Sequence, residues 1–343
     1  MHATIERTTD INLRIFDIRQ RIMAQCAELR RRHPLLNHQD ALGASILLIA
    51  MSAMISTSAL YVGGQIPWWA CVLANAFFTS FTHELEHDLL HRLYFRSRPV
   101  AQHLMMALSW LTRPTAINPW VRRELHINHH KASGTDTDLE ELTLSNGTPW
   151  GMLRGLMICD LMIGAAVMVT RAKTWRERKQ LLDTGLKAYL PLTALTWAAW
   201  YVFLGFHLIQ GIGDLSALPF HFSTSLLNAM HWLDAVVVII IAPNILRNFC
   251  LNFITSNIHY YGDINPKDLT QQVQVLNPWW LWPLQAFCCN FGGTHVIHHF
   301  VVMEPFYIRQ LSVPAAYRAM RENGVRFNDF GTFGRANRWE PKA

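Results

Sequence analysis

The chain has 343 residues, of which 51% are hydrophobic and only 16% are charged, and its formal net charge is +6. Length alone would allow two soluble domains, so the positions of the charges decide the class of protein. Lys and Arg are absent from residues 33–91 and 188–246, and residues 41–82 also lack Asp and Glu. A bilayer core takes about 20 apolar residues per helical span, so each basic-free window has room for two spans. An ordinary soluble enzyme is excluded. Without a basic stripe interleaved with aromatics, we expect no nucleic-acid partner.

The charge map predicts an all-α integral membrane protein with four transmembrane helices in two hairpins and a cytoplasmic helical cap that carries histidine clusters. The loops inside both hairpins lack Lys and Arg, so the positive-inside rule places both termini in the cytoplasm. The membrane would be the bacterial inner membrane or the endoplasmic reticulum. Spans are expected at residues 41–63, 67–90, 188–210 and 232–253, in a catalytic domain of residues 41–299 between a cytoplasmic N-terminal arm (1–40) and a cytoplasmic C-terminal tail (300–343).

Residues 151–170 are apolar enough to form a fifth span. Arg154, Asp160 and the basic run at 171–179 favour instead a cytoplasmic helix that lies in the membrane interface. A fifth crossing would also separate His259 from His126 by the width of the membrane. A plain transmembrane helix with one tolerated Asp is the alternative.

Histidines are the second unusual feature, because the chain has 17 of them. Three clusters stand out: HELEH at residues 83–87, HINHH at 126–130 and HVIHH at 295–299. On a helix, residues i, i+3 and i+4 share a face, so each cluster presents its imidazoles on one side. Neutral imidazole binds iron, zinc, copper and nickel, and eight imidazoles are too many for one ion. The clusters therefore predict a two-metal centre.

Other residues near the expected site are candidates for the same centre. His259 follows the last span, Asn257 is close to it, and His91 continues the series of the first cluster. Metal-bound His usually donates its second ring nitrogen to a carboxylate, although acids beside the clusters could also be ordinary solvated or capping residues. The predicted ligands are His83, His87, His126, His129, His130, His259, His295, His298 and His299, with His91 and Asn257 as possible ligands and Glu84, Asp88, Asp136, Asp138 and Asp263 as possible partners of the ligands.

Two other functions use part of this pattern. HELEH matches HExxH, the zinc-protease helix in which two His bind the metal and the Glu is the general base. An intramembrane zinc metalloprotease would leave most of the other cluster histidines without a role. A metal carrier would use the same ligands, but carriers more often place acids and His within the spans, where residues 41–82 have none.

With HELEH, HINHHKASGTDTD and HVIHH in this order, residues 41–299 resemble the membrane-bound fatty acid desaturase and hydroxylase superfamily. The resemblance implies two iron ions at the cytoplasmic membrane face, O₂ as co-substrate, and oxidation of an unactivated C–H bond in a fatty acid or lipid chain. The di-iron centre would itself be catalytic, with no separate protein nucleophile. His259 looks like the additional ligand of the acyl-CoA desaturase branch, whereas His91 is not part of the usual pattern.

The same resemblance leaves the outcome of the reaction open between desaturation and hydroxylation, because a small shift of the substrate could decide it. The chain has no fused cytochrome b-type motif (HPGG). We therefore expect an external electron donor of the ferredoxin, rubredoxin or cytochrome b type, with its reductase.

Overall fold

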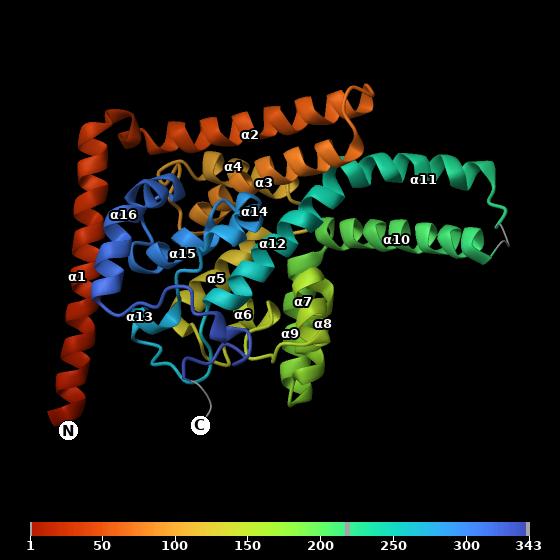
Figure 1. Ribbon diagram of the computed structural model, residues 1–343. Coiled ribbons are helices and arrows are strands. Elements are labelled where there is room, and N and C mark those ends of the chain that lie inside the picture. The colour runs from red at the N-terminus through yellow and green to blue at the C-terminus, as the bar shows by residue number, and fades with distance from the viewer. Residues whose placement is uncertain (1, 217–219, 341–343) are drawn as a thin grey trace.

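The computed structural model describes residues 2–216 and 220–340 of the chain, and these residues form helices joined by loops (Figure 1). Within these two ranges, β-type backbone pairing is limited to two isolated bridges, His259 with Val273 and Val275 with Phe327. The all-α class predicted from the sequence is confirmed for the described residues.

Three helices are long and apolar enough to cross a membrane: α2 (Gln39–Val62), α10 (Leu192–Ser216) and a continuous helix over Thr224–Ile258. The most apolar 18-residue stretches of these helices have mean hydropathies of 1.8, 1.5 and 1.8, and little of each stretch is buried by the rest of the chain. Side chains such as Ile55 and Leu195 are exposed on these helices. Exposed apolar surface of this extent needs lipid around it.

The observed bounds of the last two spans differ from the predicted ones, and each of these spans has a proline inside it or next to it. The third helix begins at Leu192 rather than 188 because α9 (Trp175–Tyr189) ends just before Pro191, which cannot continue a helix. The last is longer than the predicted 232–253 and consists of α11 (Thr224–Val236), a π-helical turn (Val237–Ile241) and α12 (Ala242–Ile258). Pro243 has no N–H for the carbonyl of Ile239, and Asn75 Nδ2 donates to that carbonyl instead, at 2.9 Å.

The remaining predicted span, at residues 67–90, coincides with α3 (Trp68–Leu90), which packs along α2. Its second half is buried and polar, with Thr79, His83 and Glu84 facing the interior. This half carries the first histidine cluster, and α3 is not among the three helices with the composition of a span. A four-span topology therefore stays a prediction.

The single helix predicted at 151–170 is two helices, α7 (Met152–Cys159) and α8 (Leu161–Arg171). Asp160 separates them, because its Oδ1 accepts hydrogen bonds from the backbone N–H of Met162 (2.8 Å) and Ile163 (3.3 Å) and so caps α8. Arg154 is not a solvated interfacial charge either. It is fully buried and donates to the carbonyl of Thr148 at 3.0 Å.

Short helices lie between and after the spans: α4 (Pro99–Leu111), α5 (Pro119–Ala132), α6 (Leu139–Thr143), α13 (Leu269–Gln272), α14 (Trp282–Ala286) and α15 (Phe291–Phe300). Of these helices, α5 and α15 carry the second and third histidine clusters. Short 3₁₀ turns lie at Pro34–Asn37, Trp279–Leu281 and Phe330–Thr332.

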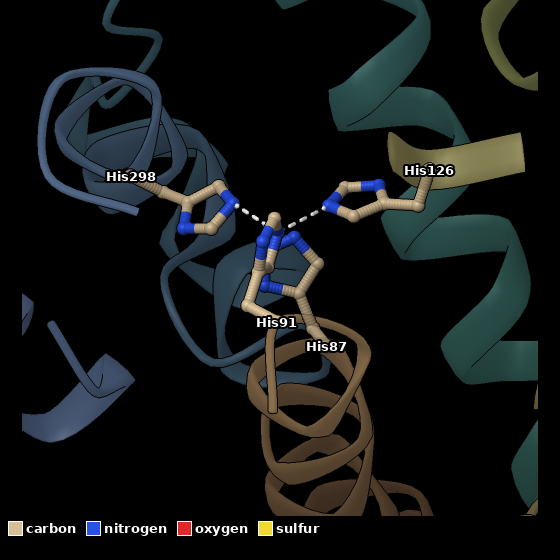
Figure 2. A group of neighbouring side chains, drawn as sticks. All are labelled: His87, His91, His126 and His298. Atoms are coloured by element: carbon tan, nitrogen blue, oxygen red, sulfur yellow. Dashed lines mark hydrogen bonds between the residues drawn. The ribbon is translucent and has the colours of Figure 1, made fainter. Parts of the chain in front are cut away.

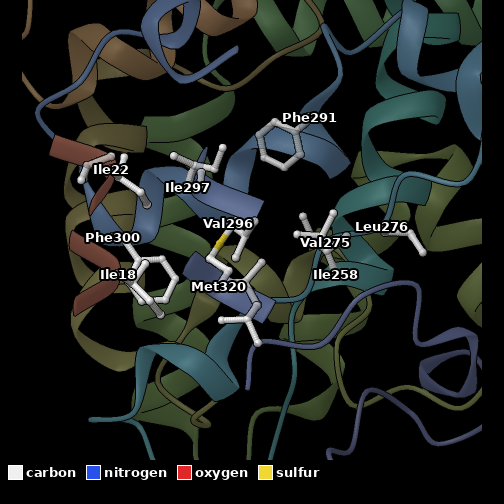
Figure 3. Packing of buried hydrophobic residues seen from close by; sticks show 14 of the residues in the cluster. Ile18, Ile22, Ile258, Val275, Leu276, Phe291, Val296, Ile297, Phe300 and Met320 are labelled. Carbon is white, nitrogen blue, oxygen red and sulfur yellow. The ribbon is translucent and has the colours of Figure 1, made fainter. Parts of the chain in front are cut away.

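The two terminal segments pack against this histidine-bearing region. Helix α1 (His2–Arg32) stands along one edge of the molecule beside α16 (Phe306–Glu322) (Figure 1). Ile18 and Ile22 of α1 join Ile297 and Met320 in one buried apolar cluster (Figure 3). Arg19 Nε donates to the carbonyl of residue 300 at 3.0 Å. The termini therefore help to hold α15 and its histidines in position.

Candidate metal centre

Helices α3, α5 and α15 bring the three histidine clusters together. Helix α5 starts at a favourable cap, because Asn118 Oδ1 accepts the N–H of Trp120 at 3.0 Å and Pro119 occupies the first turn. Helix α15 follows Asn290, which has a left-handed φ of 55°. Since i, i+3 and i+4 share a helix face, α5 and α15 each present three imidazoles on one side.

A first histidine group consists of His87, His91, His126 and His298, whose candidate ligand nitrogens all lie within 4.8 Å of one another. Figure 2 shows the four rings converging from α3, α5 and α15. The Nε2 atom of His91 lies 3.0 Å from Nε2 of both His126 and His298. His91, a possible ligand in the sequence, is therefore inside the group.

A second histidine group consists of His129, His259, His295 and His299, and all four are buried. The Nε2 atoms of His295 and His299 are 3.2 Å apart. His259 reaches this group because α12 ends at Ile258 and the chain turns there to form a bridge with Val273. The two groups adjoin, since the rings of His126 and His129 are separated by 5.7 Å between centroids.

His130, His83 and Asn257 lie differently from the eight grouped histidines. His130 is beside the first group, with its Nε2 at 2.9 Å from Nε2 of His298. His83 is in neither group, and Arg113 Nη1 lies 3.2 Å from its Nδ1. The amide of Asn257 is engaged elsewhere, because its Oδ1 accepts from Arg154 at 3.1 Å and its Nδ2 donates to the carbonyl of residue 253.

Carboxylates face the ring nitrogens that point away from the two groups. Nδ1 of His126 lies 2.9 Å from Glu140 Oε2, and Nδ1 of His129 lies 2.8 Å from Asp138 Oδ2. Nδ1 of His259 lies 3.1 Å from the carbonyl oxygen of Thr255, and Glu141 Oε2 is also 3.1 Å away. Carboxylate and carbonyl oxygens only accept, so each Nδ1 carries the hydrogen and each Nε2 lone pair points into the centre. His299 Nδ1 lies 3.1 Å from Oε1 of Gln272 in the same arrangement.

The other acids named in the sequence analysis have different surroundings. Glu84 and Asp88 pair with Arg309 of α16, at 3.1 and 3.0 Å, and Arg309 Nη1 lies 3.0 Å from Nδ1 of His298. Asp136 is exposed. Asp263 is exposed and accepts the backbone N–H groups of residues 339 and 340. Of the five acids, Asp138 alone is seen to contact a histidine of either group directly.

Sequence reasoning missed Glu140, Glu141, Gln272 and Arg309. A signal existed for the two glutamates, because they follow the second cluster within the acid-rich run DTDLEE. Asp138 caps α6 by accepting the N–H of Glu141, at 3.4 Å, and α6 carries both glutamates to the rings. Gln272 and Arg309 had no local signal, since they reach the centre from distant helices.

Burial sets the protonation of most of these imidazoles. Burial, followed by the nearby imidazoles, lowers the pKa of His91 to about 2 and holds the pKa of His299 well below its usual range. Burial would lower the pKa of His129 as well, but the Asp138 carboxylate outweighs it and raises that pKa to about 10. Neutral rings are the form that binds metals, and His129 would lose its proton to a metal ion.

The chemistry of this donor set fits metal ions. Both ring nitrogens of His87 and the Nε2 atoms of His129 and His259 are buried without a hydrogen-bond partner among the described residues. Buried polar atoms without partners are unfavourable, and the nearby nitrogens cannot all satisfy one another, because each neutral ring has one N–H. Metal ions at the two groups would use these lone pairs.

An apolar cavity of about 480 Å³ lies beside the centre. Helices α8 and α9 supply much of its apolar lining, and His83, Arg122 and Glu140 lie at its histidine side. The same three residues also line a pocket of about 30 Å³ among His87, His126, His129 and His295. An apolar cavity therefore lies next to a polyhistidine centre.

An all-helical fold with apolar spans and two histidine groups defines a membrane protein with a candidate metal centre. The family model for fatty acid desaturases matches residues 66–331, most of the chain. The chain belongs to the fatty acid desaturase family, and it is therefore an oxidoreductase that acts on fatty acids. A search of the curated proteins found no match to the chain.

Proposed function

We propose that this protein is a di-iron membrane oxidase that uses O₂ and electrons from an external donor to desaturate or hydroxylate an acyl chain. The observation that carries the proposal is the pair of adjoining four-histidine groups beside an apolar cavity. Imidazole suits iron, and eight imidazoles are too many for one ion. Iron bound there would supply the activation of O₂.

The ligands that we propose follow the geometry of the two groups. The first group, with His130 beside it, holds one iron, and the second group holds the other. His91 takes the place that the sequence analysis gave to His83, and Asn257 is not a ligand. Glu140, Asp138 and the carbonyl of Thr255 keep a hydrogen on Nδ1 of His126, His129 and His259, and so aim Nε2 at the metals.

The overall reaction balances in either of two forms. In desaturation, a saturated pair of carbons loses two hydrogens, and O₂ with two electrons and two protons leaves as two waters. In hydroxylation, the same O₂, electrons and protons give an alcohol and one water. The chain contributes the apolar cavity, which positions the acyl chain and excludes water from the reacting carbons.

The zinc-protease alternative requires Glu84 to act as the general base. Glu84 instead lies 3.1 Å from Arg309, and His83 and His87 of the same motif do not share a histidine group. The desaturase assignment uses both groups and needs no such base.

We also propose the topology and partners that this function needs. α3 would be a fourth span, so that two hairpins hold the histidine centre at the cytoplasmic face with both termini on that side. A ferredoxin, rubredoxin or cytochrome b-type protein with its reductase would supply the electrons.

Metal analysis of the purified protein in detergent tests the function most directly. We expect about two irons per chain, and a single zinc would contradict the proposal. His298→Ala should remove iron and oxidase activity together, whereas a peptidase that uses HELEH would keep its activity in this variant. Comparing the lipids of cells with and without the gene would then show whether the product gains a double bond or a hydroxyl.

The ligand assignment has its own test, because His83 and His91 lie about two helical turns apart in one segment. His91→Ala should lose iron, and His83→Ala should retain it. His207→Ala is the matched control, since His207 lies on α10 and pairs with Asp234 at 2.9 Å. The assignment is wrong if His83→Ala loses as much iron as His91→Ala.

A further inference from the structure

The apolar cavity contains a basic side chain that the proposed metal chemistry does not use. Arg247 of α12 lines the cavity and is 2% exposed. Its Nη2 donates to the side chain of Asn248, but its Nε and Nη1 have no hydrogen-bond partner in the part of the chain that the structure describes. A buried guanidinium with free N–H groups is strongly unfavourable unless a ligand pairs with it.

The charges around the cavity leave Arg247 without a counter-ion. Arg113 and Arg122 also line the cavity, and both are paired with the buried Glu86. Arg122 lies 3.4 Å from Glu140, which already accepts a hydrogen bond from His126. The three guanidiniums are therefore accompanied by two carboxylates, Glu86 and Glu140. Neither carboxylate pairs with Arg247. The cavity has an excess of positive charge at this end.

We infer that Arg247 binds the free carboxylate of the acyl substrate, with the apolar tail lying along α8 and α9. The inference rests on the proposed function and specifies its substrate class as an unesterified fatty acid. A guanidinium presents its N–H groups in a planar fork that matches a carboxylate. Arg247 lies within the helix Thr224–Ile258, one of the three with the composition of a membrane span, where a basic residue indicates function by default.

The rest of the cavity favours a small anionic group over a large one. Away from its basic end the lining is apolar, with residues such as Leu161, Val169 and Leu186. A nucleotide or phospholipid headgroup needs many polar partners, and this lining offers few. A single carboxylate uses the free N–H groups of Arg247 and leaves the apolar walls to the alkyl tail.

This orientation places the carboxyl end of the substrate near the histidine centre. His83, Arg122 and Glu140 line both the cavity and the small pocket among the histidines. Glu140 touches His126 at 2.9 Å. The carbons closest to the carboxylate therefore lie closest to the metals, and oxidation is expected near the carboxyl end of the chain rather than at its middle.

Calorimetric binding of dodecanoic acid, its methyl ester and dodecanol to the purified protein tests the inference without any turnover. Wild-type protein should bind the acid about 10- to 100-fold more tightly than the ester or the alcohol, the usual size of a charge-assisted hydrogen bond. Equal or tighter binding of the ester would overturn the proposal, and this comparison needs no variant.

Variants locate the effect at Arg247. Arg247→Gln should bind acid and ester alike, and Arg247→Lys should restore part of the preference because it restores the charge. Arg154→Gln is the matched control. Arg154 is a fully buried arginine beside α12, but it is not among the residues lining the cavity. It should keep the wild-type preference, and an acid preference that persists in Arg247→Gln would refute the assignment.

The same measurements separate this inference from the proposed function. Binding is compared in iron-free and iron-loaded protein, so a chain that held one zinc would contradict the oxidase while the acid preference still tested Arg247. In active protein, the new double bond or hydroxyl should lie within the first few carbons of the acid. Exclusive oxidation at the far end of the chain would contradict the orientation.

Discussion

Glu140 is the carboxylate whose removal should weaken the metal centre most cleanly. Its Oε2 lies 2.9 Å from Nδ1 of His126, and its Oε1 lies 3.4 Å from Nε of Arg122. Glu140→Ala removes the acceptor that keeps the hydrogen on Nδ1, so the His126 ring is free to rotate or to change tautomer. Glu140→Gln keeps an oxygen that can accept this hydrogen but loses the negative charge.

Loss of such a partner usually lowers metal affinity about 10- to 100-fold, or about 1.4–2.8 kcal/mol. We expect Glu140→Ala to reach the upper part of this range, because it also leaves Arg122 without one of its carboxylates. Glu140→Gln should reach only the lower part. The measurement is the iron content after dialysis against a graded series of chelator concentrations.

Glu322→Ala is the control for removal of a paired glutamate, because Glu322 contacts Arg21 at the surface, far from α5 in the sequence. Exposed ion pairs contribute little to stability, so this variant should titrate as the wild type does. If Glu140→Ala retained iron at wild-type chelator concentrations, Glu140 would not support His126 as a ligand.

Three further predictions concern the scaffold. Asn75→Leu leaves the carbonyl of Ile239 without a donor and should destabilise the protein by about 1–3 kcal/mol in detergent, whereas a thermal midpoint equal to that of wild type would contradict this. Asp160→Ala removes the cap of α8 and should cost about 1 kcal/mol in unfolding free energy, and Asp160→Asn, which can still cap, should cost less. Burial raises the pKa of Asp329, but hydrogen bonds from Arg335 and other nearby side chains outweigh burial and hold that pKa below its usual value of 3.8. Asp329 therefore stabilises the fold above this pH and loses the effect as the pH falls through its folded pKa. The difference in unfolding free energy between wild type and Asp329→Asn should therefore shrink below about pH 4, and a constant difference would argue against the ion pair.

Periodicity could predict which histidines share a helix face because it depends on local geometry. Spacings of three and four residues place His126, His129 and His130 on one face of α5 regardless of the rest of the fold. The division of the histidines between two groups could not be predicted in this way. His126 and His129 are on one face of one helix, yet they belong to different groups, because α3 approaches one and the end of α12 approaches the other.

Charge patterning predicted the apolar helices but misjudged single charged residues within apolar segments. Arg154 was interpreted as a charge of an interfacial helix, and its side chain is buried with carbonyl partners. Asp160 was interpreted in the same way, and it divides the one expected helix into two. Hydropathy averages over a window and cannot register a hydrogen bond from one side chain to a particular backbone group.

Arg247 shows why a buried charge in a span carries more information than the hydropathy of the span itself. The Lys- and Arg-free window ends at residue 246, although the helix continues to Ile258. Arg247 lies within the span predicted at residues 232–253, and its side chain is buried at a cavity with N–H groups left free. A solvated arginine would be enough to set the topology of a membrane span. The burial of Arg247 without a counter-ion therefore requires another explanation, and an anionic ligand provides one.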